Sequence, residues 1–132
     1  MPTVFTRVMT GELPGRIVYS DDRCAAFLTI APLRSGHTLV VPREEIGNWL
    51  DLPDDLLAHL GEVSRRVGRA VVEATRAERV GLIIAGFEVD HVHLHLIPAD
   101  TMDDLDFARA DASPDQAAED AVAQRIRDAL AA

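Results

Sequence analysis

The sequence contains very little cysteine and comparatively few basic residues. Cys24 is the only cysteine among 132 residues, so no disulfide can form within the chain. Lys and Arg total 13 against 22 Asp and Glu, which gives a formal net charge of −9. Because affinity for nucleic acids and anionic membranes depends on clustered basic residues, this balance excludes a general binder of either. A small phosphorylated ligand remains compatible with it, since a local site can bind an anion whatever the net charge.

Long apolar runs are missing as well. No stretch approaches the 20 or so apolar residues that a transmembrane helix needs. Residues 1–13 lack the basic start and apolar run of a secretory signal, so we expect a cytoplasmic location. The length fits one domain, and 48% hydrophobic with 27% charged residues is typical of a globular protein. We therefore expect a single domain over residues 1–132.

Apolar residues alternate between the periods of strands and helices along the chain. Strands are expected at residues 16–20, 24–30, 37–41, 80–85 and 92–97. One long amphipathic helix is expected at 52–77, and a second from Ser113 to about Leu130. Gly61 and Gly68 lower the helix propensity of the first, and we expect close packing against a partner element there. The order of elements favours an α+β antiparallel sheet over a doubly wound parallel one.

Three histidines alternate with aliphatic residues in the segment 91–97, His-Val-His-Leu-His-Leu-Ile. In an extended strand, alternate side chains point to opposite faces, so one face carries three imidazoles and the other three aliphatic side chains. Imidazole has an ordinary pKa of about 6.5 and can act as a base, an acid, a nucleophile or a metal ligand. A strand does not need three of them to fold, so the segment predicts a functional site.

The residues alone leave four uses of this histidine row open. One is a metal site, although the outer two histidines of such a strand lie about 13 Å apart and one ion cannot bridge all three. Another is nucleophilic catalysis, in which an imidazole nitrogen attacks phosphorus and water breaks down the covalent intermediate. The others are a pH-sensitive binding surface and a merely solvated face, which the strict alternation disfavours.

The segment from His91 to Ile97 resembles the motif of the histidine triad (HIT) family, and so do other parts of residues 4–98. Residues 5–18, 26–32 and 36–42 resemble the family's N-terminal stretch, its ribose-side strand and the segment with a further active-site histidine. The resemblance implies a five-stranded antiparallel sheet with a long helix packed on it, in a homodimer. It also implies cleavage at the α-phosphorus of a nucleotide through a nucleotidyl-histidine intermediate, without a cofactor.

The resemblance assigns a role to each of four histidines. His93 would be the nucleophile, oriented by a main-chain carbonyl, and His95 would contact phosphate oxygens and assist the leaving group. His91 and His37 would complete the cluster, whereas His59 is interpreted as a solvated helix position. We expect a purine nucleoside phosphate, phosphoramidate or dinucleoside polyphosphate as the substrate. The nucleoside-binding residues would be Phe27, Thr29 and Ile30, with Leu28 or Ile17 beside the base.

Two groups of residues depart from the family pattern. The positions of the zinc-binding Cys-x-x-Cys and of a histidine carry Thr3, Thr6 and Glu45, so we predict no structural zinc and no metal site. The acidic ribose ligand is replaced by Thr29. Acidic residues 99–132 form an extension, whose segment 102–107 is expected either to fold back over the site or its dimer partner or to be solvated.

The loop before the triad carries the departure that bears most on chemistry. Gly86, Phe87 and Glu88 stand where the family has a phosphate-binding Gly-Gln-Ser/Thr. Phe87 cannot donate a side-chain hydrogen bond, and an ionised Glu88 facing phosphate would repel it by about 4 kcal/mol at 4 Å and an effective dielectric near 20. The sequence thus supports the reaction type more firmly than the substrate. The alternative is a non-catalytic nucleotide-binding or interaction module with the same fold.

Overall fold

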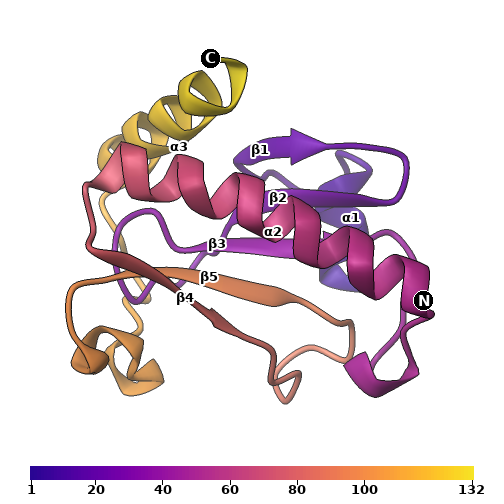
Figure 1. Ribbon diagram of the computed structural model, residues 1–132. Helices are drawn as coiled ribbons and strands as arrows, with labels where there is room; N and C mark the ends of the chain where they lie inside the picture. Colours follow the sequence, from indigo (N-terminus) through magenta and orange to yellow (C-terminus); the bar gives the residue numbers. More distant parts are fainter.

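A computed structural model describes all 132 residues and contains one antiparallel sheet with helices on both sides of it (Figure 1). The strand order is β1-β2-β3-β5-β4, and every neighbouring pair is antiparallel. The strands are β1 (Ile17–Ser20), β2 (Cys24–Leu28), β3 (Thr38–Pro42), β4 (Arg79–Ile83) and β5 (Leu94–Ala99). The helices are α1 (Val4–Met9), α2 (Asp54–Thr75) and α3 (Gln116–Ala131), with short 3-10 turns η1 (Trp49–Asp51), η2 (Met102–Leu105) and η3 (Phe107–Arg109). The expected α+β sheet, long helix and C-terminal helix are confirmed.

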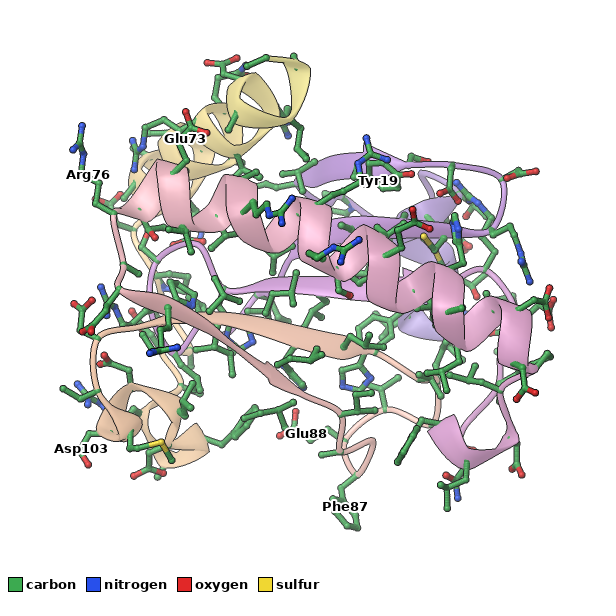
Figure 2. All side chains as sticks on the ribbon, in the orientation of Figure 1. Tyr19, Glu73, Arg76, Phe87, Glu88 and Asp103 are labelled. Carbon is green, nitrogen blue, oxygen red and sulfur yellow. The ribbon has the colours of Figure 1, made fainter.

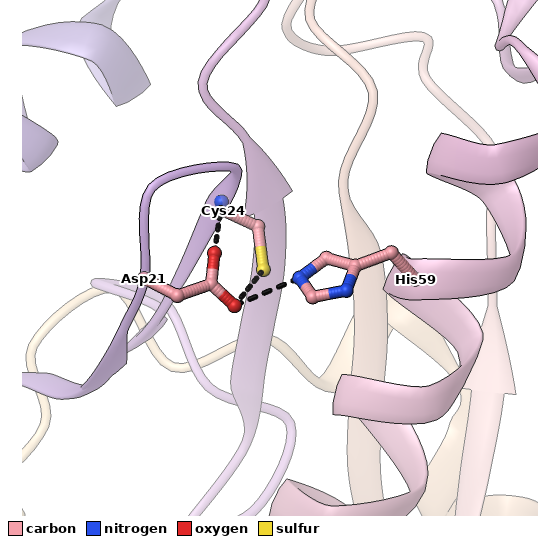
Figure 3. Close-up of side chains that lie close together, drawn as sticks. All are labelled: Asp21, Cys24 and His59. Atoms are coloured by element: carbon pink, nitrogen blue, oxygen red, sulfur yellow. Dashed lines mark hydrogen bonds and ion pairs between the residues drawn. The ribbon is translucent and has the colours of Figure 1, made fainter.

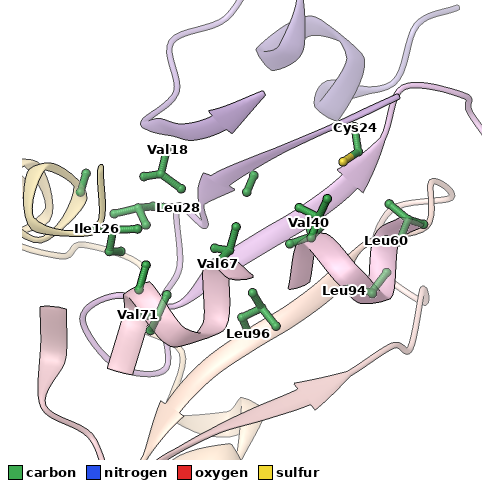
Figure 4. Close-up of a cluster of buried hydrophobic side chains, with 14 of the residues drawn as sticks. Val18, Cys24, Leu28, Val40, Leu60, Val67, Val71, Leu94, Leu96 and Ile126 are labelled. Carbon is green, nitrogen blue, oxygen red and sulfur yellow. The ribbon is translucent and has the colours of Figure 1, made fainter. Parts of the chain in front are cut away.

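Helix α2 packs its apolar stripe across one face of the sheet. Pro53 precedes its first residue, and Asp54 and Asp55 lie in its first turn, where the helix dipole favours negative charge. The helix ends where Arg76 adopts a left-handed conformation with φ of 59°. Side chains of α2, the sheet and α3 form the main core (Figure 4), which includes Leu60, Val67, Val71, Val18, Cys24, Leu28, Val40, Leu94, Leu96 and Ile126.

The opposite face of the sheet carries a smaller apolar cluster and the histidines. Phe27, Leu39 and Val41 pack there against Phe5 and Val8 of α1. Helix α1 was not among the expected elements, because six residues are too short for a periodic pattern. Its start is fixed locally, since the hydroxyl of Thr3 accepts a hydrogen bond from the Thr6 amide at 3.2 Å.

The strand that carries the histidines is shifted two residues from its expected position. It covers 94–99 rather than 92–97, because the amide of Val92 donates to the carbonyl of Ile46 instead of to a ladder. Pro98 therefore lies inside β5. The missing N–H of proline is tolerated because β3 pairs only with residues 94–96, which leaves that edge of the strand free beyond Leu96.

Two further expectations about local packing differ from the structure. A Cβ atom on Gly61 would meet nothing within 4 Å, and one on Gly68 would meet only Val80 at 3.9 Å. No element of the same chain packs on Gly61, and Val80 of β4 contacts Gly68 at an ordinary van der Waals distance. Strand β2 ends at Leu28 rather than Ile30. None of the helices has both the length and the apolar character that crossing a membrane would require.

Candidate functional site

Four histidines from two parts of the chain gather on the face of the sheet away from α2. His95 belongs to β5, His91 and His93 directly precede this strand, and His37 directly precedes β3. All four are buried. The rings of His93 and His95 lie 4.8 Å apart, and those of His37 and His95 5.1 Å apart. The structure thus brings the four histidines of the sequence prediction into one continuous cluster.

His93 is oriented by the main chain. Its Nδ1 lies 2.7 Å from the carbonyl oxygen of His91, so Nδ1 carries the proton and donates it to that oxygen. In the neutral ring this leaves Nε2 with a free electron pair. The rings of Phe5 and His93 pack in a T-shaped arrangement, with centroids 4.9 Å apart. The expected orientation by a main-chain carbonyl is therefore present, and it leaves Nε2 of His93 as the unprotonated nitrogen.

A chain of hydrogen bonds sets the tautomer of His95. The amide of Leu33 donates to Nδ1 of His37 at 3.1 Å, so the proton of neutral His37 sits on Nε2. That nitrogen lies 2.9 Å from Nδ1 of His95 and donates to it. The proton of neutral His95 is consequently on Nε2, which makes this nitrogen a hydrogen-bond donor.

Burial keeps the imidazoles of His37, His91 and His95 neutral near pH 7. Desolvation, reinforced by His95 and His93, lowers the pKa of His37 to about 3. Desolvation, reinforced by His93, lowers the pKa of His95 to about 4. The pKa of His91 is also lowered by burial, although the Pro42 carbonyl and Glu45 oppose this shift. The tautomers assigned to the neutral rings of His37 and His95 therefore apply at physiological pH.

His93 and His95 lie between two clefts. The first has a volume of about 260 Å³ and is mainly apolar; it is lined by residues that include Val4, Phe5, Phe27, Leu28, Thr29, Ile30, Glu88 and Val89. The second has a volume of about 230 Å³ and is lined by Ala85, Gly86, Phe87, Glu88 and Phe107 in addition to the two histidines. Only the two histidines and Glu88 line both. A substrate that spans the clefts would place its central atoms at the imidazoles.

The predicted binding residues divide between these clefts. Phe27, Thr29 and Ile30 line the first, as does Leu28, whereas Ile17 does not. The hydroxyl of Thr29 accepts from the Ala31 amide at 3.3 Å. Gly86 and Phe87 line the second cleft, and Figure 2 shows Phe87 at the tip of the loop pointing away from the sheet. Its side chain is 97% exposed.

Two aromatic residues of the site were not among the predicted site residues. Phe5 reaches the histidines from α1, and Phe107 reaches them from the C-terminal extension. Phe107 packs on both His95 and His37, so the segment 102–107 folds back over the histidines of its own chain, one of the expected arrangements. No periodicity marks either residue, because each belongs to a short segment. An aromatic residue within an acidic stretch was the one available signal for Phe107.

The positions that hold zinc in the resembling family lie together here and form hydrogen bonds. Nδ1 of His91 accepts from the Thr3 hydroxyl at 2.6 Å, and Nε2 of His91 donates to the Pro42 carbonyl at 2.7 Å. The carboxylate of Glu45 accepts from the Thr6 hydroxyl at 3.1 Å and from the Thr3 amide. Neutral hydroxyls are poor replacements for cysteine thiolates, so these residues do not fit a structural zinc ion.

Comparisons with known proteins agree with this geometry. The model of the HIT domain matches residues 10–102. A zinc-bound histidine triad family protein from Mycobacterium smegmatis has a TM-score of 0.83 and 30% identity, over 97% of this chain and 92% of that one. The hypothetical histidine triad nucleotide-binding protein ST2152 from Sulfolobus tokodaii also has a TM-score of 0.83, with 29% identity over 96% of this chain and 91% of that one.

A curated plant protein extends the likeness to a named activity. The adenylylsulfatase HINT3 of Arabidopsis thaliana is 30% identical over 77% of this chain and 54% of its own length. The family match alone covers more than half of the chain and includes the histidine segment, β3 and the loop before β5. The protein therefore belongs to the histidine triad (HIT) family, of the bacterial type.

Proposed function

We propose that this protein hydrolyses or transfers a nucleotidyl group through a covalent intermediate on His93. The observation that carries the proposal is the orientation of the ring: Nδ1 donates to the His91 carbonyl at 2.7 Å, so the unprotonated Nε2 is available between the two clefts. The relatives named for nucleotide binding and adenylylsulfatase activity support a nucleotide substrate. A purine nucleotide suits the larger, mainly apolar cleft beside Phe27.

Two histidines support the proposed transfer of the nucleotidyl group. Nε2 of His93 forms a bond to the α-phosphorus while the bond to the leaving group breaks, and the departing group takes a proton from water. The positive charge that develops on the ring is stabilised by the His91 carbonyl at Nδ1. The Nε2–H of His95 stabilises a phosphoryl oxygen or the departing atom by donating a hydrogen bond. Water then attacks phosphorus and releases a proton to solvent, the phosphorus–nitrogen bond breaks, and neutral His93 is restored.

The two clefts separate the two halves of the substrate. We place the nucleoside in the cleft lined by Phe27, Thr29 and Ile30, and the leaving group in the cleft lined by Phe87 and Phe107. Glu88 lines both, next to the phosphoryl position. Its negative charge disfavours leaving groups that are themselves anionic. Among the candidate substrates this favours a phosphoramidate with a neutral or cationic amine over a dinucleoside polyphosphate.

We also propose that two copies pair through α2 and β4. Strand β4 is the last in the sheet, so its outer edge is unpaired. A groove of about 400 Å³ beside it is lined by Gly61, Ser64, Gly68, Val80 and Leu82. The Ser64 hydroxyl is buried without a partner, and Leu82 is 53% exposed. A second copy would cover these groups and would pack on Gly61, where a Cβ atom would meet nothing of the same chain within 4 Å.

Mass spectrometry after mixing the protein with adenosine phosphoramidate tests the covalent step. We expect a transient adenylyl adduct and AMP product with the wild type, and neither with His93→Ala. His59→Gln, which changes a histidine on the other face of the sheet, should behave like the wild type. Tight AMP binding without adduct or product would instead support the non-catalytic nucleotide-binding module.

A further inference from the structure

The turn between β1 and β2 and helix α2 bring three different metal-ligating side chains together on the face of the sheet opposite the triad (Figure 3). Asp21 lies in the turn, Cys24 begins β2, and His59 extends from the second turn of α2. We propose that these three residues bind a thiophilic divalent cation such as Zn²⁺. His59, interpreted as a solvated helix position, is only partly exposed, and its Nε2 lies 2.8 Å from Oδ2 of Asp21.

The ligand atoms already lie near metal-binding geometry. Sγ of Cys24, a carboxylate oxygen of Asp21 and a ring nitrogen of His59 lie within 4.8 Å of one another. Oδ2 of Asp21 is 2.8 Å from Nε2 of His59 and 3.7 Å from Sγ of Cys24. Two ligands of a tetrahedral zinc ion, at about 2.0–2.3 Å from the metal, are separated by about 3.3–3.8 Å. The three atoms could therefore enclose an ion after small side-chain movements.

The carboxylate of Asp21 is held in place before any ion arrives. Its Oδ1 accepts from the amides of Arg23 and Cys24, each at 2.8 Å. Its Oδ2 therefore faces the thiol and the imidazole, and Tyr19 donates its hydroxyl to the same oxygen at 2.7 Å. Fixed ligands reduce the entropy that binding costs. The Tyr19 hydroxyl lies beside these ligand atoms, and a water molecule from solvent would complete the coordination of an ion.

Access and charge also suit a cation. Cys24 is fully buried, whereas the side chains of Asp21 and His59 remain 21% and 28% exposed, so an ion can enter from solvent and reach the thiol. Binding would replace the thiol proton and move the Nε2 proton of His59 to Nδ1 or to solvent. One thiolate and one carboxylate neutralise a divalent ion. The nearby guanidinium groups have partners of their own, since Arg43 donates to the Asp21 carbonyl and Arg23 pairs with Asp55.

The proposed site is independent of the proposed reaction. Cys24 contributes to the core beneath α2, whereas His93 and His95 line the clefts on the other face of the sheet. Loading the site should therefore leave nucleotide turnover unchanged. Loss of metal binding would not affect the catalytic proposal, and loss of turnover would not affect the metal proposal.

Titration of the full-length protein with Co²⁺ provides the test, because a thiolate–Co²⁺ complex has a charge-transfer absorption in the near ultraviolet. We expect stoichiometric binding with this band, displacement by Zn²⁺, and loss of the band in Cys24→Ser and in His59→Gln. Because Cys24 is in the core, circular dichroism must show that Cys24→Ser is folded. His59→Gln changes a partly exposed helix position, so it tests metal binding without disturbing the core. His93→Ala should retain the band. Failure to bind Co²⁺, or binding without the charge-transfer band, would overturn the proposal. So would a band that is lost in His93→Ala but retained in His59→Gln.

Discussion

The ring of Phe107 meets the ring of His95 edge-on, with centroids 5.0 Å apart and an angle of 80° between the planes. This contact joins the C-terminal extension to the histidine cluster and removes one side of His95 from water. The extension is held in place by the carboxylate of Asp104, which accepts from Arg34 at 3.0 Å. The segment after β5 thus belongs to the wall of the second cleft.

Phe107→Ala should raise the pKa of His95 from about 4 toward its ordinary value near 6.5, because desolvation is the main cause of the lowering. NMR titration of the imidazole signals measures this change. Phe87→Ala is the matched control, since Phe87 lines the same cleft but is 97% exposed. Equal pKa values for His95 in the two variants would show that the Phe107 ring does not shield it.

Replacing His37 should separate its positioning role from simple packing. His37→Leu removes the donor to Nδ1 of His95, so His95 can present a lone pair instead of N–H toward the phosphate. We expect kcat to fall about 100-fold with little change in KM. His37→Gln retains a donor and an acceptor, and its kcat should stay within about tenfold of the wild type. If both variants lost activity equally, the tautomer argument would be wrong.

Glu88→Gln should change the choice of leaving group. Removing the negative charge should raise kcat/KM for ATP or a dinucleoside polyphosphate by up to about tenfold, since the carboxylate is exposed and solvent screens its charge. Activity toward an uncharged amine phosphoramidate should stay nearly constant. Steady-state kinetics with both substrates at two salt concentrations provides the measurement. A uniform effect on both substrates would indicate a structural role for Glu88.

Stability should decrease as the pH falls from 7 to 5. The unfolded chain protonates His37 and His95 below about pH 6.5, whereas the folded protein does so only near pH 3 and 4, so the unfolded state binds more protons in this window. One pKa unit corresponds to about 1.4 kcal/mol, so each histidine should cost about 2 kcal/mol at pH 5. Urea unfolding of the wild type at both pH values measures the total loss.

His95→Asn is the comparison that isolates one histidine, and its loss between pH 7 and 5 should be smaller by about 2 kcal/mol. Glu119 has the opposite effect on the pH dependence of stability, because burial raises the pKa of its carboxyl group in the folded protein. The difference between the two proteins cancels this contribution. If the free energy of unfolding changed equally with pH in the wild type and in His95→Asn, His95 would be protonated as readily in the folded chain as in the unfolded one.

Leu82→Glu should disrupt the proposed pairing of two copies. The new charge would be buried against the second copy, which costs far more than exposing it to water. Sedimentation velocity should show dimers for the wild type and monomers for this variant. Met102→Glu is the control, because Met102 is also an exposed apolar residue but lies outside the groove. A monomeric wild type would contradict the proposal directly.

The sequence alone determined the fold class, the family and which histidines gather in the candidate site. Alternation around His93 and the apolar stripe from Leu56 to Val71 reflect repeat distances within single elements, and such distances are set by backbone geometry. The expected antiparallel sheet and long helix follow from those patterns. Strand boundaries differed from the expected ones where a contact with another part of the chain decided them. The start of β5 is an example, because the Val92 amide donates to the Ile46 carbonyl instead of to a neighbouring strand.

The tertiary structure alone decided how the histidines are protonated and what surrounds them. The tautomer of His95 depends on His37, which is 58 positions away, and the thiol of Cys24 meets His59 only because α2 crosses the sheet at that turn. Phe107 reaches the cluster through a fold of the acidic extension. Such contacts arise from packing between separate elements. The periodicity of one segment carries no information about the partner that another segment will place against it.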